Sequence, residues 1–433
     1  MKRIGLLLVV LGMWTAVCGQ SVAHQREARF GKGANLSNWL EAYWMGSGWP
    51  QPGKYQRADL QAMKDAGMST VRVPFCFAMI TDTLNAPYVV DFNSAGIAWL
   101  DSVIDWTGAL GMNLIICNQH GWDVTNGNYQ SKIAPMSAMW TQVATHYAGL
   151  DPEHYFFEML NEPPVGVLPA NADAVNQACI DAVRQVDTVH TLVVGPHTAS
   201  IGSSYLSFSP YADPNLIYTF HTYEPLYFTH QGFTWMTPQF PTGVPFPFLG
   251  DDALLRGAIS AAVNWRDTNG LPVFMGEFGV GIYADADSRC NWIALLGDLV
   301  DQHQLNALAW DWGGVAPSDF SMFDALPPSV STMNSCFAEA MHFYEPNRVQ
   351  EAAVGKGLRL WPNPSAGKVW LEAPKAMAAV EWVDAQGRVA QKQAFERALM
   401  QVELATEGLQ EGVWLLRVHF RDGSVESRVL VRE

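Results

Sequence analysis

The chain is short of positive charge and of cysteine. It carries 26 Lys and Arg against 42 Asp and Glu, a formal net charge of −16, which argues against nucleic acids and polyanionic substrates as partners. Only 6 Cys occur, with no CxxC pair and no Cys/His cluster at zinc spacing, so no metal site is predicted. The Gly-x-Ser-x-Gly elbow of serine esterases and a Gly-rich phosphate-binding fingerprint are also missing.

Long apolar runs are missing except at the N-terminus. Two basic residues precede the apolar stretch 5–17, a pattern typical of an export signal, which we place at residues 1–23. This run is too short for a comfortable membrane span, and no other segment is long and apolar enough, so no membrane span is predicted. A lipid anchor on Cys18 is the weaker alternative, because Val17 stands where a small residue is expected.

The few cysteines are expected to differ in their roles. Cys18 would leave with the signal, whereas Cys76 and Cys117 stand in apolar runs typical of buried thiols. Cys290 and Cys336 are a possible disulfide pair. The remaining composition, 49% hydrophobic and 16% charged, is that of a globular protein, and 433 residues are too many for one typical core.

Eight short apolar runs alternate with amphipathic stretches between residues 24 and 346. Continuous apolar strands separated by helices indicate a parallel sheet covered on both faces. Eight such units predict a closed (β/α)₈ TIM barrel, with a doubly wound open sheet as the alternative. The expected strands are 30–35, 69–74, 113–118, 155–160, 191–195, 216–220, 272–276 and 307–310, and the expected helices are 57–66, 94–110, 136–148, 172–187, 252–268 and 289–302.

Two glutamates stand at the ends of apolar strands. Glu162 follows the run 155–160, and Glu277 follows the run 272–276. In a barrel this end of the strands carries the active site, and a charge there is costly unless it is compensated. Glycoside hydrolysis needs such a pair of carboxyl groups. Other polar or aromatic residues stand at or near the carboxyl ends of the expected strands: Asn35, Arg72, His120, Asn161, His221, Tyr223, Trp310 and Trp312.

The motifs at these strand ends resemble those of glycoside hydrolase family 5. They are Asn161-Glu162-Pro163, Gly276–Gly279, Gly33–Glu41, Val71–Pro74, His120-Gly121, His221–Tyr223 and Trp310, in the order of the family across residues 28–345. The resemblance implies a (β/α)₈ barrel and a retaining mechanism on β-linked glycans, with no metal or cofactor.

The two glutamates then take different roles. Glu162 is expected to be the general acid/base, with a pKa raised by the negative charge of Glu277. Glu277 is expected to be the ionised nucleophile, oriented by Arg72 and Tyr223, although Arg72 as a structural ion-pair residue is an alternative. Glu158, inside the fourth strand, is expected to pair with a charge within the barrel.

The other site residues are expected to contact the sugar. Asn161 would hydrogen-bond the 2-hydroxyl group, a contact that strengthens in the transition state. His120 and His221 would bind the sugar or tune the carboxyl groups, with a structural buried histidine as the alternative for His120. Trp310 would stack beneath the reacting sugar, and Trp312 is the weaker candidate because it is expected to pack in the core.

The expected activity is that of a secreted endo-β-1,4-glucanase acting as a monomer on a β-linked glucan or a related polysaccharide. A β-mannanase, a xyloglucanase and an exo-β-glucanase of the same family remain open, as does a non-catalytic surface glycan-binding protein. Residues 224–250 form a long connection rich in aromatics and Pro, which is expected to line the cleft and to decide between substrates.

After a linker at 347–357, short alternating strands predict a small all-β sandwich domain over 358–433. Leu360–Gly367 and Gly412–Val418 resemble the C-terminal sorting domain of the type IX secretion system of Bacteroidetes. This resemblance implies that the type IX secretion machinery is a partner and that the chain is secreted or held at the cell surface after export through the periplasm. A carbohydrate-binding sandwich is the alternative, with Trp361, Trp370, Trp382 and Trp414 as an aromatic strip. The expected strands are 357–361, 368–372, 380–384, 401–404, 412–420 and 427–431.

Overall fold

The structure is a computed structural model. It describes residues 21–313, 318–343, 358–361, 363, 365, 367–384, 388–406, 408–422 and 424–432. Most of the predicted signal 1–23, the whole predicted linker 347–357 and the predicted turn 385–387 lie outside these residues. The chain divides into two compact units, Met1–Glu345 and Pro346–Glu433.

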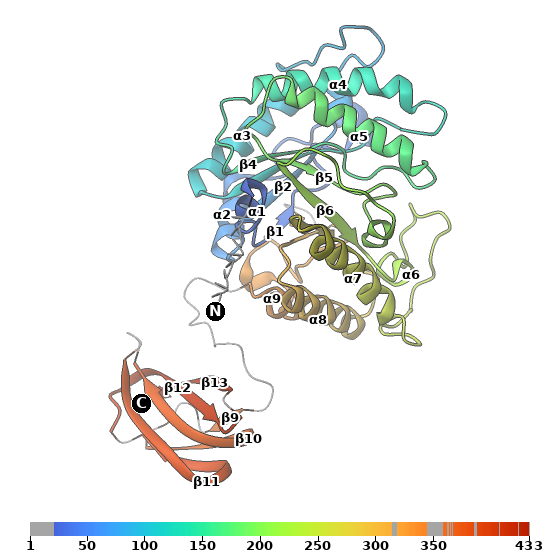
Figure 1. Cartoon of the computed structure of the whole chain (residues 1–433). Coiled ribbons are helices and arrows are strands. Elements are labelled where there is room, and N and C mark those ends of the chain that lie inside the picture. The colour runs from blue at the N-terminus through green and yellow to red at the C-terminus, as the bar shows by residue number, and fades with distance from the viewer. Residues whose placement is uncertain are drawn as a thin grey trace, which may run out of the picture. The chain divides into compact units, whose positions relative to one another are not determined.

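The first unit is a closed barrel of eight parallel strands (Figure 1). Each strand pairs with the next in sequence, and β8 closes the barrel on β1, with Lys32 opposite Ala307. The strands are buried almost throughout because both of their faces are apolar, so the predicted TIM barrel is confirmed. The strands are β1 (Lys32–Asn35), β2 (Thr70–Phe75), β3 (Asn113–Asn118), β4 (Tyr155–Glu158), β5 (Leu192–Val194), β6 (Leu216–Thr222), β7 (Val273–Phe278) and β8 (Ala307–Ala309).

Helices surround the strands, largely where amphipathic stretches predict them (Figure 1). The helix α4 begins at Tyr129, earlier than the predicted start at residue 136. The prediction began after Pro135 because a proline normally marks a helix boundary, but here Pro135 lies inside the helix. Within the described part of the chain, no helix is both long and apolar enough to cross a bilayer. The α-helices are α1 (Val22–Glu27), α2 (Arg57–Asp65), α3 (Ala95–Leu110), α4 (Tyr129–His146), α5 (Pro169–Arg184), α6 (Leu226–Thr229), α7 (Asp252–Asn269), α8 (Ala286–His303) and α9 (Ser335–Met341), and the 3₁₀ helices are η1 (Tyr43–Gly48), η2 (Phe77–Ile80), η3 (Gly202–Leu206) and η4 (Val330–Thr332).

The amino-terminal end of the barrel is filled with apolar side chains and covered by α1. The Phe30 ring meets the rings of Phe156 and Phe274 edge-on, with centroids 4.8 and 5.0 Å apart. Ala23 of α1 belongs to the same buried cluster. The Ser21 hydroxyl caps α1 by accepting a hydrogen bond from the His24 amide. The predicted boundary between residues 23 and 24 therefore runs through a helix that packs on the barrel.

Arg26→Ala is expected to lower the free energy of unfolding by about 2 kcal/mol. The buried guanidinium donates hydrogen bonds to Glu153, the Val189 carbonyl and the Thr191 hydroxyl. Arg29 also pairs with Glu153, but its side chain is 40% exposed, so Arg29→Ala is the matched control and should cost about 0.5 kcal/mol or less. Urea unfolding of the two variants measures the difference, and equal losses would contradict this role of α1.

The second unit is an antiparallel sheet in the order β11-β10-β12-β13, with β9 paired to β10, and it confirms the predicted all-β region. The predicted strands 368–372 and 380–384 are one strand, because register shifts after Glu372 and Met377 change which face is apolar without ending it. The strand β11 begins earlier than predicted. The pattern of apolar residues did not reveal its first half, because that half is polar and exposed. The strands are β9 (Arg359–Trp361), β10 (Lys368–Val383), β11 (Val389–Ala405), β12 (Gly412–Phe420) and β13 (Val425–Arg432).

The tryptophans of this unit do not form one exposed strip. Trp382 is buried in the core of the sheet, and Trp414 packs partly buried against that core. Trp361 and Trp370 lie opposite each other on β9 and β10 and are 39% and 41% exposed. Two of the four residues are therefore core residues, as their strand period predicts.

The cysteines follow the sequence prediction. A disulfide joins Cys290 of α8 to Cys336 of α9. Cys76, Cys117 and Cys179 are free and buried among the described residues. Burial raises the pKa of the Cys179 thiol well above its ordinary value, so this group stays protonated.

Candidate active site

Arg72 of β2 organises the carboxyl end of the barrel. Its side chain is fully buried, and its N–H groups reach five oxygen atoms at 2.7–2.8 Å. Two of these oxygens belong to Glu158, which binds the guanidinium in a bidentate fashion, and the others to Asn35, Asn161 and Glu277. A guanidinium has five N–H donors, so every donor has an oxygen partner. The expected pairing of Glu158 inside the barrel is confirmed.

Glu277 is held at both carboxylate oxygens. Arg72 donates to Oε1 at 2.7 Å, and the Tyr223 hydroxyl donates to Oε2 at 2.9 Å. Burial and the charge of Glu277 raise the pKa of Tyr223 well above its usual value, so this hydroxyl stays protonated. The side chain of Glu277 is 5% exposed and cannot swing out to solvent without losing both partners. The arrangement suits an oriented nucleophile.

Close contact between β6 and β7 places His221 beside Glu277. A Cβ atom at Gly276 would lie 2.4 Å from the Thr219 hydroxyl and 3.2 Å from His221 Nε2, so only glycine allows this approach. The register brings His221 opposite Glu277, and His221 Nδ1 lies 3.7 Å from Glu277 Oε2.

Glu162 completes a group of three. It follows β4, its side chain is 36% exposed, and its Oε1 lies 2.6 Å from His221 Nδ1. One donor atom each of Glu162, His221 and Glu277 lies within 4.8 Å of the others. Among the described residues, these three form a group whose donor atoms are close enough to hold a metal ion. However, both carboxylate oxygens of Glu277 already accept hydrogen bonds, one from Arg72 and one from Tyr223.

The protonation of this group differs from the sequence prediction. Burial raises the pKa of Glu277, and the charge of Glu162 adds to this effect, against the charges of His221 and Arg72. Burial acts to lower the pKa of His221, but Glu277 and Glu162 raise it overall. For Glu162, burial acts upward, but the hydrogen bond and charge of His221 lower the pKa overall. The expected rise in the pKa of Glu162 is therefore wrong for the substrate-free site, because His221 outweighs the effect of burial.

The remaining predicted site residues lie around this centre. Asn161 is buried, and its Oδ1 accepts from Arg72, which leaves its amide N–H₂ as the group available to a ligand. Trp310 follows β8 and is partly buried, and its backbone N–H donates to the Phe278 carbonyl at 2.8 Å. Trp312 is fully buried and packs edge-on against Phe323, in agreement with the packing role expected for it.

His120 lies at the rim and not in the central network. Its exposed ring contacts Tyr43 and Trp44, with centroids 5.9 and 5.8 Å away. The alternative of a buried structural histidine is therefore wrong. Tyr43 and Trp44 are 41% and 56% exposed on η1, and the sequence did not single them out because no motif or strand end marks them. Their aromatic character and their place after β1 are the signals that were available.

The long connection after β6 carries a chain of aromatic rings that starts at the centre. The Tyr223 ring contacts His230 at 5.2 Å, and the His230 ring contacts Trp235 at 5.6 Å. Trp235 is 57% exposed and stacks on Phe233. Glu224 instead turns back and accepts hydrogen bonds from the Thr222 hydroxyl and the Tyr223 amide, so it is not directed at a ligand.

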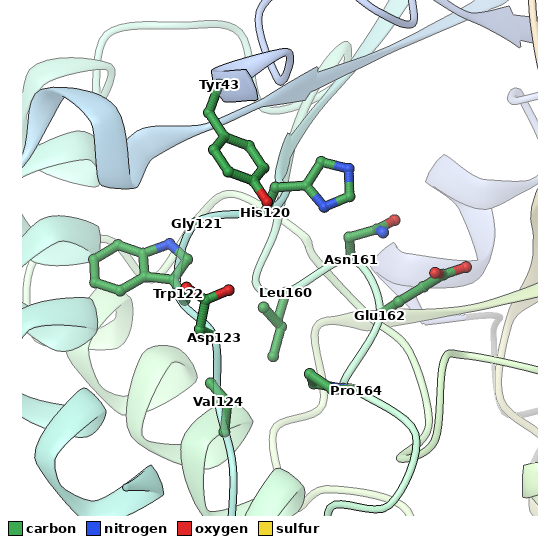
Figure 2. A pocket seen from close by; sticks show the side chains of 10 residues that line it. All are labelled: Tyr43, His120, Gly121, Trp122, Asp123, Val124, Leu160, Asn161, Glu162 and Pro164. Carbon is green, nitrogen blue, oxygen red and sulfur yellow. The ribbon is translucent and has the colours of Figure 1, made fainter. Parts of the chain in front are cut away.

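A hollow of about 130 Å³ opens beside Asn161 and Glu162. It lies between the segment after β3 and the segment after β4, with Tyr43 of η1 at its edge (Figure 2). The residues that line it are Tyr43, His120, Gly121, Trp122, Asp123, Val124, Leu160, Asn161, Glu162 and Pro164.

Arg72→Met is expected to destabilise the protein by about 3–5 kcal/mol, because it leaves Glu158 and Glu277 buried without their counter-ion. The double variant Arg72→Met/Glu158→Leu removes one of these charges and should recover part of the free energy of unfolding, but not the activity. Urea unfolding of both variants tests this role. A single variant as stable as the wild type would contradict it.

Two family models match the chain. A model described as cellulase (glycosyl hydrolase family 5) matches residues 29–315, and one described as a secretion system C-terminal sorting domain matches residues 359–432. The first range contains the whole network around Arg72, and the second contains the antiparallel sheet almost completely.

Individual proteins show the same relationship. Endoglucanase 3 of Fibrobacter succinogenes is 29% identical over 333 residues, which cover 65% of this chain and 49% of that protein. Endoglucanase H of Acetivibrio thermocellus is 28% identical over 299 residues, which cover 68% of this chain and 31% of that protein. The chain thus matches about half or less of the length of these relatives. The solved structure of endoglucanase Cel5A from Thermotoga maritima, also solved with mannotriose, has a TM-score of 0.65 at 25% identity and covers 74% of this chain and 99% of its own.

Proposed function

The chain belongs to glycosyl hydrolase family 5, and from this premise we propose that it is a secreted, retaining β-glycosidase acting as an endo-β-1,4-glucanase. The observation that carries the retaining mechanism is the spacing of the carboxyl groups. Glu162 and Glu277 have oxygen atoms within 4.8 Å of each other. Retaining glycosidases hold their carboxyl groups about 5–5.5 Å apart, whereas inverting enzymes hold them about 6.5–9.5 Å apart to admit a water molecule.

In the first step Glu277 attacks the anomeric carbon, and the bond from that carbon to the glycosidic oxygen breaks. Glu162 gives its proton to the departing oxygen. Arg72 and Tyr223 keep the carboxylate of Glu277 in one orientation, so little freedom is lost when it attacks. In the second step Glu162 takes a proton from water, which attacks the anomeric carbon and releases Glu277.

The proton on Glu162 depends on His221. In the substrate-free site the two groups share one short hydrogen bond, and the proton lies toward His221 because the charge of Glu277 raises the pKa of the imidazole. A sugar that shields His221 from Glu277 weakens this effect and returns the proton to Glu162. Glu162 is ionised after it has given its proton to the departing oxygen, and in this form it acts as the base of the second step. His221 therefore positions the proton and need not contact the reacting atoms.

Three further residues bind the sugar in this proposal. The amide N–H₂ of Asn161 donates to the 2-hydroxyl group, since its Oδ1 is already bound to Arg72. Trp310 supplies a flat surface beneath the reacting sugar, and His120 with its aromatic neighbours binds the chain at the rim.

The substrate preference rests on the relatives, which are endoglucanases. A β-mannan is the second candidate, because the solved Cel5A was obtained with mannotriose. An exo-acting enzyme and a non-catalytic glycan-binding protein are less well supported, the latter because both carboxyl groups are present in an oriented network.

The test is hydrolysis of carboxymethyl-cellulose, barley β-glucan, xyloglucan, glucomannan and laminarin by the full chain. Release of reducing ends from β-1,4-glucans, with a rapid fall in viscosity, is expected of an endoglucanase. Cleavage of glucomannan alone would favour the mannanase. Binding without cleavage of any glycan would favour the glycan-binding protein and overturn the proposed activity.

We also propose that residues 358–433 act as an export address read by the type IX secretion machinery, as the match to a sorting domain supports. Deletion of 358–433 is expected to spare kcat/KM in a cell lysate but to retain the enzyme inside the cell. The buried cluster of this unit is separate from that of the barrel, which is why activity should survive. Fractionation of a host with this secretion system measures the outcome, and normal secretion of the truncated chain would refute the address.

A further inference from the structure

A left-handed turn follows the short strand β5. Thr198, Ala199 and Ser200 have φ angles of 65°, 52° and 50°, a conformation that residues other than glycine seldom adopt. Three such residues in a row cost free energy that other contacts must offset, and backbone of this kind is often found at functional sites. A Cβ atom at Gly195 would lie 2.1 Å from the Ser200 hydroxyl, so a larger residue there would push the hydroxyl away. The mechanism described above gives this turn no role.

The turn lies where strand pairing between β4, β5 and β6 has ended. The last pair of β4 and β5 is Glu158 with Val193, and the last pair of β5 and β6 is Val194 with Tyr218. Beyond these pairs the segment with Glu162 and the end of β6 continue toward the rim of the barrel. Their relative position at the rim is thus set by the segment that follows β5 and not by a strand between them.

Ser200 connects the two segments on either side of this interval. Its fully buried hydroxyl donates a hydrogen bond to the Asn161 carbonyl at 2.7 Å, and its own carbonyl accepts one from the His221 amide at 2.8 Å. The Ala199 amide donates to the Pro163 carbonyl at 2.6 Å. The turn therefore holds the backbone carbonyl groups of both neighbours of the proposed acid/base residue, and it is tied to the proton-sharing histidine as well.

This arrangement bears on the distance between Glu162 and His221. The two residues belong to segments that are not neighbours in the barrel order, yet Glu162 Oε1 lies 2.6 Å from His221 Nδ1. The Asn161 side chain is fixed independently, because its Oδ1 accepts a hydrogen bond from Arg72. Loss of the Ser200 hydrogen bond should therefore displace Glu162 more than the side chain of Asn161.

We propose that Ser200 is a positioning residue, which sets the separation of Glu162 and His221 and so keeps the acid/base proton shared between them. This inference rests on the proposed function. Ser200 acts only through the backbone on either side of it and does not touch the sugar. A serine hydroxyl suits this role because a single donor at the base of the turn reaches the carbonyl that precedes Glu162.

The proton shared by the pair gives this role a measurable signature. The hydrogen bond and the charge of Glu162 help to raise the pKa of His221, so a wider separation should lower that pKa and release the proton at a lower pH. The other charged or titratable groups that act on the pair are unchanged in the variants below; they are Arg72, His120, Tyr223 and Glu277.

The experiment measures kcat/KM of Ser200→Ala in the full chain on barley β-glucan and on an activated aryl β-cellobioside. This constant reports the steps up to the first bond cleavage, in which only the glucan needs a proton on its leaving oxygen. We expect a loss of about 10²-fold on the glucan and of about threefold on the aryl glycoside. The basic limb of the pH profile on the glucan should move to lower pH, and NMR titration should show a lowered pKa of His221.

Two further variants separate positioning from folding. Ser204→Ala is the matched control: it removes a buried hydroxyl of the same region, which donates to the Thr198 carbonyl at 3.3 Å and not to the segment that carries Glu162. It should change neither the ratio of the two losses nor the pH profile. Ser200→Gly removes the hydroxyl but suits the left-handed conformation, so it adds no backbone strain and should show the kinetic pattern of Ser200→Ala.

The outcomes separate this inference from the proposed function. Equal losses on both substrates in Ser200→Ala, or an unchanged pH profile, would overturn the positioning role and leave the endoglucanase standing. Wild-type kinetics in Ser200→Gly would overturn it as well. Failure of the wild-type chain to cleave either substrate would refute the proposed function itself, and with it the reaction that Ser200 is proposed to serve.

Discussion

Glu277→Gln is expected to lower kcat on every glycoside by about 10⁵-fold while leaving substrate affinity within a few-fold of the wild type. The amide has nearly the same shape as the carboxylate, but it cannot form the glycosyl-enzyme ester. Its carbonyl oxygen still accepts a hydrogen bond from Arg72 or Tyr223, so the network of the free enzyme changes little. Steady-state kinetics with an aryl β-cellobioside give kcat, and calorimetric titration with cellotetraose gives the affinity.

A second readout follows from the pKa of His221. The charge of Glu277 is the strongest influence that raises this pKa, so the neutral amide should lower it, which NMR titration of the imidazole measures. Glu339→Gln on α9 is the matched control for the loss of one negative charge, and it should change neither kcat nor the titration. Retention of even a tenth of the wild-type kcat in Glu277→Gln would remove Glu277 from the role of nucleophile.

Glu162→Gln is expected to slow cleavage of glucans by about 10³-fold but that of activated aryl glycosides by about tenfold or less in the bond-breaking step. A sugar alcohol leaves poorly unless its oxygen is protonated, whereas a nitrophenolate leaves without help. Because Glu162 also serves as the base that activates water, the second step slows as well, and the glycosyl-enzyme accumulates. A burst of aryl alcohol followed by slow turnover is therefore expected in stopped-flow measurements.

The contrary result for Glu162 is also clear. Equal losses on natural and activated substrates, without a burst, would mean that this residue only supports the geometry of the site. In that case the acid would have to come from another group near the leaving oxygen, and His221, 2.6 Å away, is the neighbour to test next.

The barrel and most of the site were predictable because they depend on local pattern. Strands such as β3 are buried on both faces, so their apolar runs mark them directly, and the polar residues that follow β4 and β7 must meet at one rim. The charge of Glu158 inside a strand requires a partner of opposite charge, and Arg72 lies inside the strand β2 of the same barrel. The positions of Glu162 and Glu277 on one site followed from topology alone.

Other properties depend on distances that no sequence pattern carries. The pKa of Glu162 falls because His221 Nδ1 is 2.6 Å from it, although the two residues follow or end different strands, β4 and β6. The sequence alone did not show that α1 begins before the predicted end of the signal at residue 23. The packing of Ala23 in the buried cluster at the end of the barrel shows that this helix belongs to the folded domain. Tyr43 and Trp44 reach the rim through a loop whose course is set by tertiary structure.

The link between Cys290 and Cys336 makes the stability of the barrel depend on its compartment. The bond closes 46 residues, a constraint worth about 4 kcal/mol in the chain-entropy view. In a reducing cytoplasm both thiols are free, and α9 is held to α8 only by its side chains, whereas an oxidising envelope locks it in place. If the chain is exported as we propose, it is easiest to unfold while it must still be threaded through the first membrane, and it becomes resistant after it has crossed.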